Sequence, residues 1–241
     1  MMINNRRGIS ESISVVIIMA VVLALIGVML YVATYYFSNS ASSSGISLAE
    51  SFLINVADDM DTIAFHTGID RVYYIPSTPY GVMNWLPNYC VYNLSGLVFK
   101  DGAVIYGTPP NYYSMPSGFV QVLRGDGEPV STSPSSVMFQ VIQYGEDTLG
   151  GETYGTYLAL YPRPIIIGNN TNYVYIYMAS SMGGGSGRTI MSINVTDTSV
   201  VLLGKGSYPL KATCGSETAE YKVTSFGSLY VVYSNYTVTM R

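Results

Sequence analysis

The chain begins with a long apolar run, and shorter alternating segments follow it. Between Ser12 and Ala49 it contains no Asp, Glu, Lys or Arg, and Ile13–Phe37 is almost wholly apolar. A helix over Ile13–Phe37 would be about 37 Å long, which exceeds the roughly 30 Å of a bilayer's hydrocarbon core. In lipid, a helix can satisfy all its backbone donors and acceptors within one segment. The pattern therefore predicts a helix able to cross a membrane.

Behind a serine-rich segment the sequence predicts a second helix. Ser38–Gly45 has the composition of a flexible joint. Ser47–Glu50 fits a capping box, which predicts the start of an amphipathic helix that ends at Gly68. Its apolar residues recur at spacings of four and three, and we expect this stripe to pack on the chain's own sheet rather than on another chain: Ala49, Leu53, Val56, Met60 and Ile63.

From Val72 onward the pattern changes to short strands broken by Gly and Pro. Asp101-Gly102 between two apolar runs predicts a hairpin turn, and Glu128–Ser136 predicts a surface loop that could divide the region into halves. The fold class expected is α+β, with the long hydrophobic helix followed by a mainly antiparallel, immunoglobulin-like β-sandwich. Further strands are predicted at Phe119–Leu123, Val137–Tyr144, Tyr154–Tyr161, Tyr173–Met178, Thr189–Val195, Ser199–Leu203, Tyr221–Thr224 and Leu229–Met240.

Composition narrows the range of partners. The 241 residues leave enough chain behind the first helix for one domain or two small ones. Charged residues make up 11% and the formal net charge is −4, so the basic face that nucleic acid requires is not expected. The 23 tyrosines suit a charge-poor outer surface, because a ring can be buried while its hydroxyl stays hydrated. Their strand preference accounts for much of the same excess.

Whether the cysteines form a disulfide and the sequons are glycosylated depends on which side of the membrane the β region occupies. Cys90 and Cys214 form no metal or redox motif, and outside the cell a disulfide between them would add up to about 5 kcal/mol of stability. Two free buried thiols are the alternative. The sequons are about as numerous as chance gives. They are candidate glycosylation sites because the β region is expected to face outward: Asn93, Asn169, Asn194 and Asn235.

Catalytic and metal-binding patterns are not recognisable in the sequence. Asp58, Asp59 and Asp61 match no calcium loop and predict a solvated acidic face. His66 has no partners for a triad or a zinc site, so a structural role is expected. Gly183–Thr189 departs from a phosphate loop because Arg188 replaces the required Lys, and it predicts a flexible turn. We therefore expect no enzyme, no cofactor and no metal.

The residues before the apolar run indicate which end of the helix faces the cytoplasm. Arg6 and Arg7 would hold this end in the cytoplasm by the positive-inside rule, and the β region would then face outward. The apolar run is too long for an ordinary secretory signal. A membrane anchor that is never cut remains one interpretation of this topology.

A second interpretation comes from a resemblance. Arg6-Arg7-Gly8, followed by Ile9–Ser12 and the apolar run, resembles the class III signal peptide of archaeal type IV pilins and archaellins. The resemblance covers roughly residues 5–37. It implies cleavage between Gly8 and Ile9, so that the apolar helix stays on the mature protein and enters a filament core. The implied organisation is a leader at 1–8, a hydrophobic helix and joint at 9–45, an amphipathic helix at 46–68 and an extracellular β-rich domain at 69–241.

Cleavage would also change the environment of Glu11. Loss of Arg6 and Arg7 removes the charges that pin the anchor, and Glu11 becomes the third mature residue, beside the new amine of Ile9. A carboxylate among apolar helices needs a partner, and the amine of the same or a neighbouring subunit is the nearest candidate. A solvated Glu11 at the membrane surface is the alternative.

These features predict a structural subunit of an extracellular type IV pilus-like filament, held in the membrane as a precursor. Its partners would be its own copies, the prepilin peptidase, the assembly machinery and, before assembly, the membrane. The alternative from another class is a membrane-anchored cell-surface adhesion protein or a minor pilin-like protein. An anchored extracellular hydrolase is the weakest of the three hypotheses.

Overall fold

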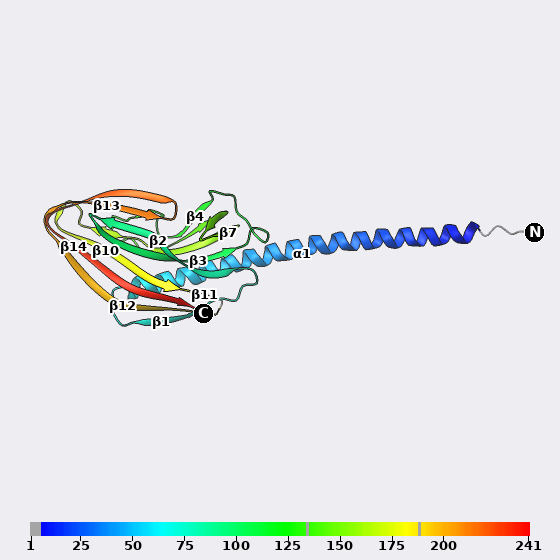
Figure 1. The fold of residues 1–241 in the computed structure, drawn as a ribbon, viewed down its shortest axis with the longest axis horizontal. Coiled ribbons are helices and arrows are strands. Elements are labelled where there is room, and N and C mark those ends of the chain that lie inside the picture. The colour runs from blue at the N-terminus through cyan, green and yellow to red at the C-terminus, as the bar shows by residue number, and fades with distance from the viewer. Residues whose placement is uncertain (1–5, 134, 188) are drawn as a thin grey trace, which may run out of the picture. The chain divides into compact units, whose positions relative to one another are not determined.

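A computed structural model describes residues 6–133, 135–187 and 189–241, with side chains described from Ile13 onward. The chain divides into two units, the first ending at Ala41 and the second, here called the head, comprising Ser42–Arg241. Helix α1 (Arg6–Ile63) contributes to both units, and a mostly antiparallel β domain follows it (Figure 1). The predicted α+β class, with a long N-terminal apolar helix before a β-rich region, is confirmed.

The head contains one large sheet and one small one. Among the described residues the main sheet has 12 strands in the order β1-β12-β14-β13-β2-β3-β8-β5-β4, while β9, β10 and β11 pair off this path. Pairing is antiparallel except between β10 and β14, which run parallel from Thr171 to Gly184. The bounds are β1 Asp70–Tyr74, β2 Val82–Leu94, β3 Leu97–Thr108, β4 Val120–Arg124, β5 Phe139–Tyr144, β6 Asp147–Leu149, β7 Glu152–Tyr154, β8 Thr156–Pro162, β9 Ile165–Ile167, β10 Thr171–Gly184, β11 Ser186–Gly187, β12 Ile190–Leu203, β13 Gly206–Cys214 and β14 Glu217–Met240.

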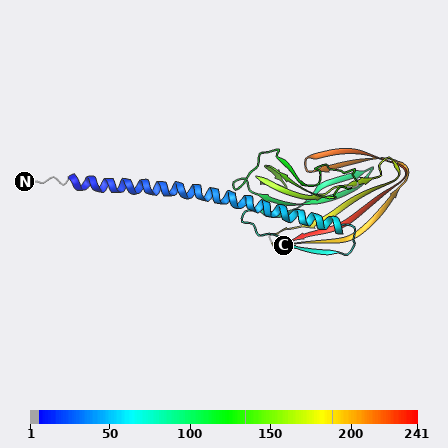
Figure 2. The same ribbon diagram turned by 180° about the vertical axis from the view of Figure 1, so that it is seen from behind.

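The part of α1 within the head, Ser42–Ile63, covers one face of the main sheet (Figure 2). We call it the anchored segment. Its stripe packs on the head's own sheet as expected, and the five stripe residues are at most 3% exposed: Ala49, Leu53, Val56, Met60 and Ile63. They meet Trp85 of β2, Val104 of β3 and Ile193 of β12 in one apolar core.

A second apolar core lies on the opposite face of the sheet. Val174 and Ile176 of β10 pack there with Leu229 of β14, against Tyr92 of β2 and Ile105 of β3. Strands β10 and β3 are not hydrogen-bonded neighbours, so the sheet curves to bring them together. The head is thus a sandwich-like body with the anchored segment on one outer face.

The serine-rich segment differs from the flexible joint that its composition predicts. Ser38–Gly45 is helical, and Ser47 lies inside α1 rather than at the start of a second helix. Packing explains the difference: Ser42 and Gly45 are buried in the head, and a Cβ on Gly45 would lie 3.0 Å from the hydroxyl of Tyr106. Small residues here let the helix approach the sheet closely, so tertiary contact overrides their low helix propensity.

The predicted hairpin turn at Asp101-Gly102 is wrong. Both residues lie in the middle of β3, and the turn between β2 and β3 is formed by Ser95-Gly96, where Gly96 has φ 98°. Gly102 is required for packing, because a Cβ there would lie 2.1 Å from the indole ring of Trp85. Asp101 is buried and hydrogen-bonded, as described below, so neither residue acts as a turn former.

Two further segments predicted as loops are fixed by contacts. Glu128–Ser136, in which Pro134 lies outside the described residues, does not divide the head, which is one unit. Buried Arg163 donates from Nη1 to the Glu128 carbonyl oxygen at 3.1 Å and forms an ion pair with Asp126. Gly183–Thr189 is not a free turn, because Gly183 and Gly184 end β10 while Ser186-Gly187 pairs with β2. Arg188 lies outside the described residues.

Candidate functional site: the exposed apolar helix

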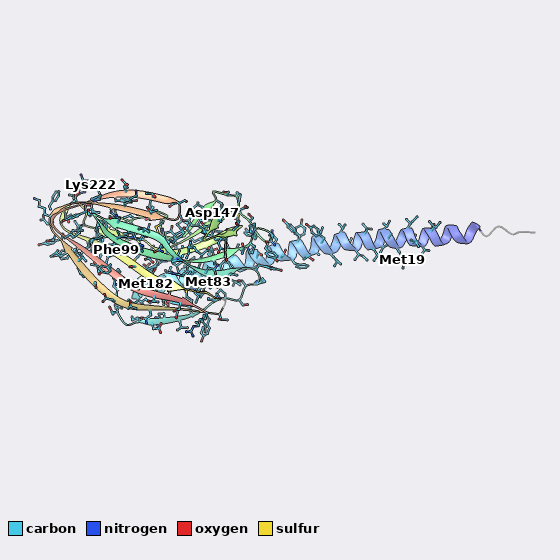
Figure 3. The ribbon with its side chains drawn as sticks, in the orientation of Figure 1. Met19, Met83, Phe99, Asp147, Met182 and Lys222 are labelled. Atoms are coloured by element: carbon cyan, nitrogen blue, oxygen red, sulfur yellow. A yellow bond between two sulfur atoms is a disulfide. The ribbon has the colours of Figure 1, made fainter. Side chains whose placement is uncertain are left out.

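The largest functional candidate is Ile13–Phe37 of α1, here called the exposed segment. Every side chain from Ile13 to Val32 is exposed in the structure, including Leu23 at 68% and Met29 at 70%. Figure 3 shows these side chains, Met19 among them, standing away from the helix. Soluble proteins rarely expose contiguous apolar surface beyond a few hundred Å², so this surface requires an apolar environment.

Polar groups within the exposed segment are satisfied by the helix itself. Thr34 donates from Oγ1 to the carbonyl oxygen of Leu30 at 2.8 Å, and Ser38 donates to that of Tyr35 at 2.9 Å just beyond it. Such bonds hide hydroxyls from a surrounding apolar medium. With a window of mean hydropathy 3.1, α1 is long and apolar enough to cross a membrane by length and composition. An N-terminal apolar helix of this kind is suited to membrane anchoring or to a signal sequence.

The predicted leader residues adjoin this segment. The backbone of these residues, Arg6, Arg7, Gly8, Ile9 and Glu11, is helical, but the side chains of residues 6–12 lie outside the part that the structure describes. Cleavage between Gly8 and Ile9 and the pairing of Glu11 therefore stay predictions.

The predicted solvated acidic face is wrong for Asp61, which holds the anchored segment to the rest of the head. Asp61 accepts hydrogen bonds from the backbone N–H groups of Met138 at 3.0 Å and Phe139 at 3.1 Å. It also pairs with Arg124 of β4, whose Nε lies 2.9 Å from Asp58 Oδ1. Asp61 is thus part of the attachment, while Asp58 is exposed on its outer side. The only signal in the sequence was the position of Asp61 next to the stripe residue Met60.

The structure places the two cysteines in one disulfide. Cys90 of β2 and Cys214 of β13 are directly opposed in register and are bonded to each other. The bond links an early strand of the head to a late one, across 124 positions of sequence. It therefore closes most of the head into one covalent loop.

The four sequon asparagines have different surroundings. Asn93 and Asn194 are exposed, and Asn93 lies at the β2–β3 turn, where its Oδ1 accepts from Gly96 N at 2.9 Å. Asn169 uses its side chain to hold β14, since Oδ1 accepts from Thr224 N at 2.8 Å. Asn235 is half-buried within β14, between β10 and β12. Accessibility therefore favours Asn93 and Asn194 as acceptors.

Asp101, at the predicted hairpin turn, is a buried carboxyl within β3. It is 0% exposed and accepts hydrogen bonds from the Ser181 hydroxyl and, at 2.9 Å, from the Tyr236 hydroxyl. Burial raises the pKa of Asp101 to about 7, although these hydrogen bonds and one from the Gly102 backbone oppose the rise. The carboxyl links β3 to β10 and β14.

A surface cleft of about 330 Å³ lies between β2 and β7. Asn84 Nδ2 donates to Glu152 Oε2 at 3.2 Å and to the Tyr154 hydroxyl at 3.1 Å, and Tyr154 donates to Glu152 at 2.6 Å. These groups satisfy one another, and no group of metal-binding side chains occurs among the described residues. His66 lies elsewhere, exposed just beyond the end of α1.

No protein-family model, curated protein or solved structure matches this chain.

Proposed function

We propose that this chain is a structural subunit of an extracellular filament of the type IV pilus kind, polymerising through its N-terminal apolar helix. The observation that supports this most strongly is the exposed segment, an uncharged helical surface over Ile13–Phe37 that needs an apolar environment on every side. A bilayer supplies that environment before assembly, and a bundle of identical helices supplies it afterwards.

Direct transfer from lipid to helix bundle is required by the energetics. Burying one Val, Leu or Ile side chain stabilises by about 1.5–3 kcal/mol, and this segment carries many of them. Exposing them together to water would cost far more than the stability of an ordinary domain.

Removal of the leader would release the helix. Cutting between Gly8 and Ile9 takes away Arg6 and Arg7 and leaves Glu11 beside a new amine. In the filament core that carboxylate would pair with an Ile9 amine, because an unpaired charge among apolar helices is costly.

The head is suited to the outer wall of such a filament. The anchored segment joins it to the helix bundle through the apolar stripe and through Asp61, which bonds to Met138, Phe139 and Arg124. The disulfide between Cys90 and Cys214 limits its unfolding outside the cell.

A permanently anchored surface protein would use the same exposed segment, and processing separates the two proposals. We expect Gly8→Val to leave a longer precursor in the membrane and to abolish surface fibres. Gly204→Val is the matched control, since a side chain there meets no atom within 4 Å. Normal fibres in Gly8→Val cells would contradict the filament proposal, and an uncut wild-type chain without fibres would favour the anchored protein.

A further inference from the structure

The sheet face that holds the anchored segment continues past the end of that helix as an uncovered apolar surface. Three adjoining strands, β10, β14 and β12, supply it. The most exposed members are Tyr173 at 63%, Leu202 at 61% and Val200 at 59%. We call the group the aromatic patch, and it consists of Tyr173, Tyr175, Val200, Leu202, Tyr230 and Val232.

Strand register places these side chains on one face. Tyr175 of β10 is opposite Tyr230 of β14, which is opposite Leu202 of β12, and the two tyrosine rings stack with centroids 5.0 Å apart. Side chains alternate along a strand, and the intervening Val174 and Leu229 are buried in the core on the other face. The patch therefore lies on the side of the sheet away from that core.

The patch is continuous with the surface that binds α1. Tyr177, two residues beyond Tyr175, contacts Phe65 just after the helix, with ring centroids 5.5 Å apart. The hydroxyls of Thr67 and Thr198 are 3.4 Å apart beside Val200. Figure 2 shows the long strands of the sheet extending past the end of α1. The patch thus begins where the chain's own helix stops covering this face.

We propose that the aromatic patch binds the exposed segment of α1 from a second copy of this chain. This inference rests on the proposed filament. No member of the patch carries a charge, and the exposed segment carries none either, so the two surfaces match in chemistry. The same face already binds one part of this helix through apolar contacts.

Side-chain size also favours this occupant. Rings of Tyr173, Tyr175 and Tyr230 project from the sheet, whereas Ala20, Ala24 and Gly27 leave a shallow face on the helix. A tyrosine packed there buries its ring while its hydroxyl reaches the edge of the contact. The head of one subunit would thereby cover the helix of another and exclude water from it.

Disulfide trapping in fibres tests the contact. One copy carries Tyr175→Cys and a co-expressed copy carries a single cysteine in the exposed segment, at Val16, Leu23 or Leu30 in separate strains. Cys90 and Cys214 are already bonded to each other, so the introduced thiols are the reactive ones. After oxidation of purified fibres, we expect a mixed dimer from at least one helix position, at ten or more times the yield obtained with Val98→Cys, a control on β3 that is 52% exposed.

The outcomes separate this inference from the filament proposal. Fibres that form normally but give no mixed dimer with Tyr175→Cys or with Tyr173→Cys would overturn the contact and leave the filament standing. Dimers formed only between two Tyr175→Cys copies would assign the patch to a head–head contact and also overturn it. Failure of the unmodified chain to form fibres would instead overturn the filament proposal.

Discussion

The exposed and anchored segments of α1 belong to one helix but have opposite surroundings. In the exposed segment apolar residues face every direction and all are accessible, as Val16 at 66% and Leu23 at 68% illustrate. In the anchored segment the apolar residues follow one stripe, and Leu53 and Val56 are buried within the same chain. A helix that is apolar all round has to be buried, and because the head leaves the exposed segment accessible, something other than the head must cover it.

Charge distribution follows the same division. In the anchored segment, Asp58 and Asp59 lie on the side of the helix that faces water, and Asp61 binds the head. The exposed segment has no acidic residue, and none occurs anywhere from Ser12 to Ala49. One part of the helix therefore stabilises the fold, while the other is left available for the assembly that we propose.

Truncation of one leucine in each segment should give the largest contrast. Leu53→Ala is expected to lower the free energy of unfolding of the head by about 2–5 kcal/mol, because it leaves a cavity in the core. Leu23→Ala should change it by no more than about 0.5 kcal/mol, since the side chain is accessible. Denaturant unfolding followed by tyrosine fluorescence measures both. Equal losses would show that the two segments do not differ in this way.

We expect the stability of the head to depend on pH through the buried carboxyl of Asp101. The pKa of Asp101 is raised to about 7 from an unfolded value near 4, so the folded state keeps a proton that the unfolded state releases. Its stabilising effect is full below about pH 4 and is lost as the pH rises through 7. In Asp101→Asn this loss of stability with rising pH should disappear. The variant and the wild type should therefore differ by at most about 4 kcal/mol in how far the free energy of unfolding falls as the pH rises.

Unfolding of Asp101→Asn at pH 4 and pH 8 tests this, with exposed Asp147→Asn as the control. Burial and Glu128 also raise the pKa of Glu217, so each variant is compared with the wild type at both pH values. An unchanged pH slope in Asp101→Asn would contradict the assignment.

A lysine introduced into the exposed segment should impair membrane retention and fibre formation, whereas one introduced at an exposed position of the anchored segment should not. Leu23→Lys is expected to lower membrane retention and fibre yield, because a lysine at the centre of a membrane helix costs about 3 kcal/mol. Leu48→Lys, at a position 53% exposed within the anchored segment, should leave both unchanged. Membrane fractionation and fibre counts provide the measurement. Wild-type fibre yield from Leu23→Lys would argue against an apolar helix core.

The smallest expected effect concerns the attachment of the anchored segment. Asp61→Asn removes the charge that pairs with Arg124 and weakens the bonds from the backbone N–H groups of Met138 and Phe139, which should cost about 1–3 kcal/mol. Asp58→Asn is the matched control, and its exposed pairing with Arg124 should be worth no more than about 1 kcal/mol. Thermal unfolding of the head compares them. A larger loss in Asp58→Asn would reverse the assigned roles.

Apolar periodicity was a reliable guide to the fold. The stripe from Ala49 to Ile63 and strands such as β4, β5 and β10 could be predicted because each depends on local spacing, whereas β2 and β13 were not predicted and β12 and β14 were each predicted as two strands. The predicted joint at Gly45 and the predicted turn at Gly102 were wrong, because small residues that permit close packing cannot be told by sequence from residues that permit turns. Asp101 and Asp61 could not be assigned from sequence, since their partners lie on distant strands. The aromatic patch likewise depends on the parallel register of β10 with β14.

The first residue of the mature chain in purified surface fibres is the most direct test of the filament proposal. N-terminal sequencing or intact mass should give a chain that begins at Ile9 and lacks residues 1–8. Chains that retain Met1, recovered as single copies from the membrane, would contradict it.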